Sequence, residues 1–139
     1  MQTLKVRIDH INMTVKNLEE SVAWYEKIFQ FQKVEQGVSE GQPWAIIRNE
    51  NSLLCLYQEP NRVAAPEGDN IFDQFHRLYH FGLNVDSSLE WEKIVQLHKI
   101  KVMYGGAIRY PHSTSWYVED PSGYEIEVSH WNNENQITF

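Results

Sequence analysis

Apolar and polar residues alternate in two short segments that lie seventy residues apart. Residues 10–15 read His-Ile-Asn-Met-Thr-Val, and residues 80–85 read His-Phe-Gly-Leu-Asn-Val. Alternation with a period of two is typical of a strand with one buried face. In each segment the apolar residues share one face, and the leading histidine, His10 or His80, lies on the other. The pattern predicts two equivalent strands, each opening with a histidine on its polar face.

A helix is expected after each of these strands. Apolar residues recur at helical spacing over residues 18–29, with Asn17 as the N-cap and two acidic residues in the first turn. In the second half, Asp-Ser-Ser at 86–88 is expected to cap a helix over residues 89–99. Both halves therefore begin with the same strand-to-helix order.

Three short strands are predicted to follow each helix. They cover residues 31–38, 43–48 and 52–57 in the first half and residues 101–109, 113–119 and 124–129 in the second. Turn residues separate them, among them Asp-Pro-Ser-Gly at 120–123. The late strands align at an offset of seventy-two residues, which places Trp44 on Trp116. The second half thus repeats the first.

The predicted fold is α+β and consists of two βαβββ modules. Module one spans residues 1–58, a linker or flap spans 59–75, module two spans 76–130 and a polar tail spans 131–139. Neither module buries its sheet alone. We therefore expect one domain in which the two mixed sheets join around a shared concave cup.

Composition and charge narrow the class of protein. A net charge of −7 over 139 residues argues against nucleic acid or an anionic membrane surface as a partner. No apolar run approaches the roughly 20 residues that span a bilayer, and the N-terminus lacks an apolar signal segment. Cys55 is the only cysteine, so no internal disulfide forms. We expect a cytoplasmic protein that binds a small molecule.

Two histidines and a carboxylate are the candidates for chemistry. His10 and His80 occupy equivalent positions and converge on one point if the modules pair. Glu125 and Glu127 share the polar face of the last strand, so alternation leaves both open as a third ligand. Two histidines and one carboxylate form a facial metal site with open positions for substrate, oxygen or water. The alternative is a pair of structural histidines and a solvated glutamate.

Three segments carry a resemblance to a known family. Residues 9–31, residues 79–85 and the Asp-Pro-Ser-Gly-Tyr-Glu-Ile-Glu stretch at 120–127 resemble the vicinal oxygen chelate superfamily. That superfamily includes glyoxalase I, fosfomycin-resistance proteins, methylmalonyl-CoA epimerase, extradiol dioxygenases and bleomycin-resistance proteins. The resemblance implies paired βαβββ modules around a metal-binding cup.

The resemblance also implies a ligand set. Positions matching His10, His80 and Glu127 bind a divalent metal in metal-using members, with Fe²⁺ favoured here and Mn²⁺, Zn²⁺ or Ni²⁺ as alternatives. Cys55 takes the place of a further ligand or base found in glyoxalase-like and epimerase-like members. A thiolate ligates zinc, whereas a cysteine in an apolar strand is more often a small hydrophobe. Asn12 replaces the threonine of fosfomycin-resistance transferases.

The stretch from residue 112 to residue 127 resembles the signature of extradiol dioxygenases. Tyr117 precedes Glu127 by ten residues, as in that signature, and His112 precedes Tyr117 by five. We expect His112 to take a proton from a catechol-like hydroxyl and Tyr117 to orient the substrate. The alternative is that His112 is simply an exposed loop residue.

The remaining expectations concern the substrate and the assembly. Asn12, Trp44, Cys55 and Trp116 are predicted to contact substrate in the cup, and His76 to approach the metal from the flap. The leading hypothesis is an Fe²⁺-dependent, ring-cleaving dioxygenase that acts on a small vicinal-oxygen compound. A non-redox lyase, isomerase or thiol transferase and a drug-sequestering protein are the alternatives. The resemblance implies a homodimer.

Overall fold

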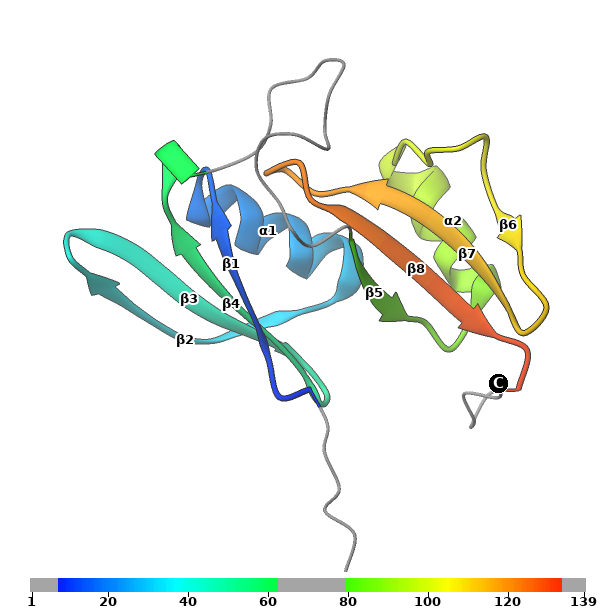
Figure 1. The fold of residues 1–139 in the computed structure, drawn as a ribbon, viewed down its shortest axis with the longest axis horizontal. Coiled ribbons are helices and arrows are strands. Elements are labelled where there is room, and N and C mark those ends of the chain that lie inside the picture. The colour runs from blue at the N-terminus through cyan, green and yellow to red at the C-terminus, as the bar shows by residue number, and fades with distance from the viewer. Residues whose placement is uncertain (1–7, 63–79, 134–139) are drawn as a thin grey trace, which may run out of the picture. The chain divides into compact units, whose positions relative to one another are not determined.

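The computed structural model describes residues 8–62 and 80–133, and the chain divides into two compact units, Met1–Val63 and Ala64–Phe139. Figure 1 shows the helices and strands of each unit. The first unit contains β1 (Ile11–Val15), α1 (Leu18–Phe29), β2 (Gln32–Ser39), β3 (Gln42–Asn49), β4 (Ser52–Gln58) and a short 3₁₀ turn (Pro60–Arg62). The second contains β5 (Phe81–Asn84), α2 (Ser88–His98), β6 (Ile108–Arg109), β7 (Ser113–Glu119) and β8 (Glu125–Trp131).

The two sheets have the same topology. Their strand orders are β1-β4-β3-β2 and β5-β8-β7-β6. In each sheet the first strand pairs in parallel with the last one, and the other pairings are antiparallel. Each unit is therefore a βαβββ module, which confirms the predicted α+β fold with its internal repeat.

The first helix has the predicted bounds, and the second begins and ends one residue earlier than predicted. The Asn17 side chain accepts a hydrogen bond from the Glu20 backbone N–H at 2.9 Å, and the Ser87 hydroxyl accepts one from Glu90 at 3.2 Å. Each bond satisfies a backbone donor that the first helical turn leaves unpaired. Gln30 follows α1 in the left-handed conformation, which ends that helix.

One face of each sheet is apolar and buried, and the other is partly exposed and carries most of the polar side chains of the strands. In the first unit the apolar face packs on α1 and includes Met13, Val15, Ala45, Ile47, Leu54 and Leu56, all of them buried. In the second unit the corresponding residues are Phe81, Trp116, Val118, Ile126 and Val128, and α2 contributes the buried Trp91. The opposite face of each sheet carries the candidate functional side chains.

The predicted strand over residues 101–109 is wrong for most of its length. Only Ile108–Arg109 forms a strand, and a turn precedes it. Tyr104, Gly105 and Gly106 have φ values of +57°, +81° and +113°, which a strand does not accept. The segment before the turn lies beside β7, where the Met103 backbone N–H donates to the Tyr117 carbonyl at 2.8 Å.

Some predictions lie outside the described residues. They are His76, most of the predicted flap and the last six residues of the tail. No helix in the described parts of the chain is long and apolar enough to cross a membrane.

Removing either helix N-cap should lower stability by a similar amount, because a side-chain oxygen caps the first turn of both helices. We expect Asn17→Ala and Ser87→Ala each to lower the free energy of unfolding by about 1 kcal/mol. Urea denaturation followed by circular dichroism measures this, with Asn17→Asp as the matched control that keeps an acceptor. A loss below about 0.3 kcal/mol in both alanine variants would contradict the capping role.

Candidate metal centre

His80 and Glu127 meet on the polar face of the second unit. The parallel register of β5 and β8 places Gly82 opposite Glu127, and His80 lies just before β5 on the same face as Gly82. The Nε2 atom of His80 is 2.9 Å from Oε2 of Glu127. Strand pairing between segments forty-seven residues apart therefore joins an imidazole nitrogen to a carboxylate oxygen.

The spacing of these two atoms fits neighbouring ligands of one metal ion. Nitrogen and oxygen donors bind divalent metals at about 2.1 Å, so two donors at right angles stand about 3.0 Å apart. The 2.9 Å between Nε2 and Oε2 agrees with this value and is equally a hydrogen-bond length. His80 and Glu127 are thus two neighbouring side chains of the described residues that could serve as metal ligands.

Two serines hold the Glu127 carboxylate. The Ser115 hydroxyl donates to Oε1 at 2.7 Å, and the Ser129 hydroxyl donates to the same oxygen at 3.2 Å. Burial raises the pKa of Glu127, but the hydrogen bonds from Ser115, His80 and Ser129 outweigh burial and leave that pKa below its usual value. Glu127 is therefore held as a carboxylate, the form that a metal needs.

Tyr117 lies beside the His80–Glu127 pair. It is the cross-strand neighbour of Glu127 on β7, and its ring meets the His80 ring edge to face with centroids 5.6 Å apart. Its hydroxyl oxygen is 2.9 Å from that of Tyr110. Burial, the bond to Tyr110 and the negative charge of Glu127 raise the pKa of Tyr117. Its hydroxyl is therefore neutral near pH 7, and either it or the Tyr110 hydroxyl is the donor between the two.

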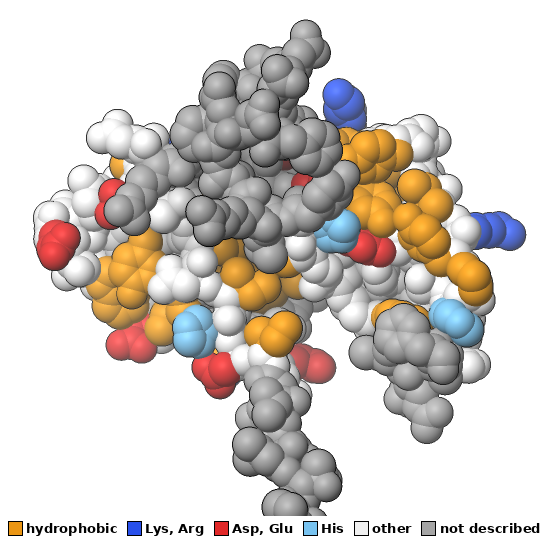
Figure 2. Space-filling model, viewed as in Figure 1, with side chains coloured by type: hydrophobic (Ala, Val, Ile, Leu, Met, Phe, Trp, Pro, Cys, Tyr) orange, Lys and Arg blue, Asp and Glu red, His pale blue; other side chains and the backbone are white. Residues whose placement is uncertain are grey.

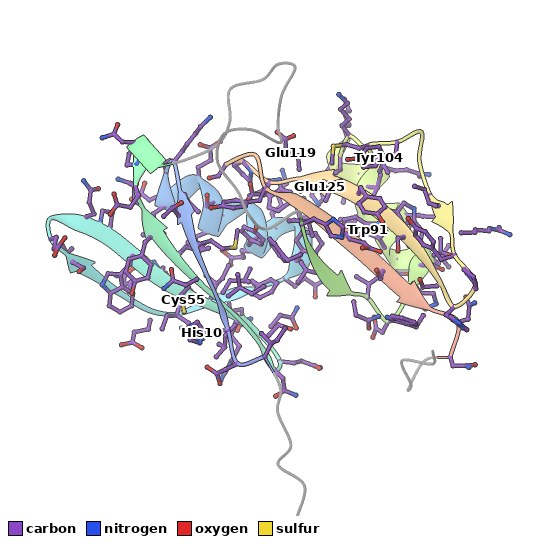
Figure 3. The ribbon with its side chains drawn as sticks, viewed as in Figure 1. His10, Cys55, Trp91, Tyr104, Glu119 and Glu125 are labelled. Atoms are coloured by element: carbon purple, nitrogen blue, oxygen red, sulfur yellow. The ribbon has the colours of Figure 1, made fainter. Side chains whose placement is uncertain are left out.

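Tyr104 reaches the same face from the turn before β6. Its hydroxyl donates to Oε1 of Glu125 at 2.7 Å, and its ring meets that of Tyr117 with centroids 5.3 Å apart. Tyr104 and Glu125 are labelled in Figure 3, and Figure 2 shows hydrophobic side chains gathered over the second unit next to histidine and acidic groups. The two glutamates that alternation left equivalent thus differ, because Glu127 contacts His80 and Glu125 contacts Tyr104.

His112 and Trp116 are not brought to the pair. Ser113 is four residues from Tyr117 on β7, which is about 13 Å at 3.3 Å per residue, and His112 is exposed one residue further on. Trp116 pairs with Val128 on the apolar face, where only 4% of it is exposed. Neither position suits contact with a substrate bound at His80 and Glu127.

In the first unit the predicted site residues share the polar face of the sheet. Asn12 is the cross-strand neighbour of Cys55, and His10 stands two residues before Asn12. The side chain of His10 is 47% exposed, with Nδ1 2.8 Å from Oδ2 of Asp9. Burial, followed by the charge of Asp9, raises the pKa of the Cys55 thiol, which favours the neutral form. His10 and Cys55 are labelled in Figure 3.

Trp44 lies on this face over a glycine. Its ring stacks on that of Tyr57 with centroids 6.1 Å apart, and a β-carbon at Gly37 would lie only 2.6 Å from the indole. Gly37 therefore leaves the space that the indole occupies. The pair offers a flat aromatic surface.

The three predicted ligands come from different units. His10 belongs to the first unit, and His80 and Glu127 belong to the second. Across residues 8–62 and 80–133, no three His, Cys, Asp or Glu side chains gather closely enough to form a metal-holding group. The part of the predicted centre that the structure describes is the His80–Glu127 pair.

Sequence reasoning missed four residues of this face. The period of two that placed Glu127 on the polar face also places Ser129 there and sets Ser115 on the same face as Tyr117, so strand alternation contained that signal. Tyr104 and Tyr110 gave no comparable signal, because a turn rather than a strand brings Tyr104 into place.

Solved structures share this fold. A glyoxylase/bleomycin resistance protein/dioxygenase domain from Frankia sp. EAN1pec has a TM-score of 0.73 at 17% identity, over 96% of both chains. Lactoylglutathione lyase from Agrobacterium tumefaciens has a TM-score of 0.66 at 20% identity, over 92% of this chain and 96% of its own. A genomically encoded fosfomycin resistance protein from Listeria monocytogenes has a TM-score of 0.68 at 12% identity, over 94% of this chain and 98% of its own.

These identities show the fold alone. No curated protein matches the sequence. The model of the Glyoxalase/Bleomycin resistance protein/Dioxygenase superfamily matches residues 7–128, which is most of the chain and includes all three motifs that carried the resemblance. The chain therefore belongs to the Glyoxalase/Bleomycin resistance protein/Dioxygenase superfamily.

Proposed function

We propose that the protein is a divalent-metal-dependent enzyme that acts on a small compound with two neighbouring oxygen atoms. The observation that carries this proposal is the 2.9 Å approach of His80 Nε2 to Glu127 Oε2. His10, at the equivalent position of the first unit, is the third proposed ligand. A metal bound there would act as a Lewis acid on both substrate oxygens.

The tyrosines would bind and orient the substrate beside the metal. The neutral Tyr117 hydroxyl, paired with that of Tyr110, donates a hydrogen bond to a substrate oxygen next to His80. A donor fixed before the reaction stabilises negative charge that develops on that oxygen. The rings of Tyr104 and Tyr117 form an aromatic wall that packs on a flat substrate and excludes water.

Ring cleavage of a catechol-like substrate is the reaction that we propose first. Its support is Tyr117, the tyrosine of the extradiol signature, which lies against His80. With two histidines and one carboxylate as ligands, Fe²⁺ is the favoured metal, ahead of Mn²⁺, Zn²⁺ and Ni²⁺. A homodimer in the cytoplasm completes this proposal.

A non-redox lyase, isomerase or thiol transferase is the second candidate. One observation favours it: His112, the base of the extradiol signature, lies at least about 13 Å along β7 from Tyr117. The hydroxyls near His80 are donors rather than bases, and donors stabilise an enolate-like or alkoxide-like intermediate without oxygen.

Loss of the Glu127 charge should abolish metal binding. We expect Glu127→Gln, which keeps the side chain's size, to weaken Mn²⁺ or Fe²⁺ binding by at least about 100-fold, since loss of a supporting residue alone costs 10–100-fold. Glu125→Gln is the matched control, because Glu125 lies on the same strand and face but contacts Tyr104. Anaerobic titration calorimetry measures both affinities.

Equal affinities in the two variants would contradict the proposed ligand. A wild-type protein that binds no divalent metal, yet binds an aromatic drug-like compound, would favour a sequestration protein instead.

Tyr117 should matter to turnover much more than His112. We expect Tyr117→Phe to lower turnover of a catechol by about 100–1,000-fold through loss of one donor. We expect His112→Ala to leave turnover nearly unchanged. An oxygen electrode follows the reaction, and metal content per chain shows that both variants stay loaded.

A large loss in His112→Ala would show that this residue acts in catalysis despite its position. Thiol-dependent turnover that ignores oxygen would establish the second candidate function.

A further inference from the structure

The Glu127 carboxylate is held through one of its two oxygen atoms. Both serine hydroxyls donate to Oε1, at 2.7 Å from Ser115 and 3.2 Å from Ser129, and Oε2 faces His80. The hydroxyl oxygens of the two serines are also 3.1 Å apart. Both serine hydroxyls therefore bond to Oε1, whereas the His80 ring bonds to Oε2.

The serines are placed by the same strand pairing as Glu127. Ser115 and Ser129 are cross-strand neighbours, two residues along β7 and β8 from the Tyr117–Glu127 pair and on the same face. Ser115 is completely buried. A buried hydroxyl needs a hydrogen-bond partner, and the Ser115 hydroxyl has Glu127 Oε1 as its acceptor at 2.7 Å. The same hydrogen bond therefore orients both the serine hydroxyl and the glutamate carboxylate.

An unsupported glutamate would not keep this orientation. The terminal torsion of a glutamate is broad and roughly two-fold, so its two oxygens exchange places freely. A carboxylate also binds a metal through one oxygen or through both. With Oε1 occupied by two donors, Glu127 would bind a metal through Oε2 alone.

We propose that Ser115 and Ser129 are positioning residues that make Glu127 a one-oxygen ligand, with Oε2 directed to the metal beside His80. This inference rests on the proposed function. It assigns a role to two side chains that touch neither metal nor substrate, and it predicts that the metal's coordination changes when they are removed.

The test compares three serine substitutions in the full-length protein. Ser115→Ala removes the shorter bond, and Ser115→Thr keeps a hydroxyl on the same β-carbon. Ser113→Ala is the matched control, because Ser113 is on the same strand and face, is 8% exposed and makes no hydrogen bond to Glu127 among the described residues. Titration with Co²⁺ gives the affinity, the visible absorption of the Co²⁺-loaded protein reports its coordination, and thermal unfolding of the metal-free protein reports stability.

We expect Ser115→Ala to bind Co²⁺ 10–100-fold more weakly and to change the intensity of the absorption bands, because a freed carboxylate alters the ligand set. Ser115→Thr should recover most of the affinity, and Ser113→Ala should match the wild type in both measurements. If Ser115→Ala does not fold, Ser129→Ala, at a partly exposed position, gives the same comparison.

Wild-type affinity and spectrum in Ser115→Ala would overturn the inference, as would an equal loss in Ser113→Ala. If Glu127→Gln abolishes binding while Ser115→Ala does not weaken it, the inference alone fails. If the wild type binds no divalent metal, the proposed function and the inference fail together.

Discussion

The parallel pairing of β5 with β8 is the constraint on which the candidate site depends. It joins the start of the second module to its end, and its register sets Gly82 opposite Glu127. His80, two residues before Gly82, then reaches the carboxylate across the polar face. A slip of one residue would turn Glu127 to the apolar face, where Ile126 and Val128 are fully buried. The hydrophobic packing that stabilises the sheet thereby also fixes the site.

This face of the second unit carries a charged group, the Glu127 carboxylate, next to a neutral one, the Tyr117 hydroxyl. Glu127 keeps its charge because three hydrogen bonds outweigh the effect of burial on its pKa. Tyr117, one strand away, is held neutral by burial, by its bond to Tyr110 and by that same charge. A carboxylate that favours a cation therefore adjoins a hydroxyl that favours a developing anion. This combination suits a substrate whose oxygen atoms gain negative charge during the reaction, whether or not molecular oxygen is a co-substrate.

Strand alternation and cap residues were enough to predict all the elements but the strand over residues 101–109, because both signals are local. Asn17 and Ser87 cap the helices as expected, and Ser113–Glu119 is a strand with the predicted bounds. Alternation could not separate Glu125 from Glu127, since that choice depends on the register with β5. It also could not place Tyr104, because the Gly-Gly turn overrides the strand pattern there. The resemblance to the extradiol signature suggested His112, but an extended strand carries it away from Tyr117.

The most direct test of the account is a crystal structure of the Mn²⁺-loaded protein with data collected at the manganese absorption edge. The account predicts one anomalous peak per chain beside His80 and Glu127, with Glu127 bonded through Oε2 alone. Serines at Oε1 and the Tyr117 hydroxyl facing the open side of the metal would complete the agreement. An anomalous peak away from His80 and Glu127 would contradict the account. The absence of any peak in crystals grown with saturating Mn²⁺ would also contradict it.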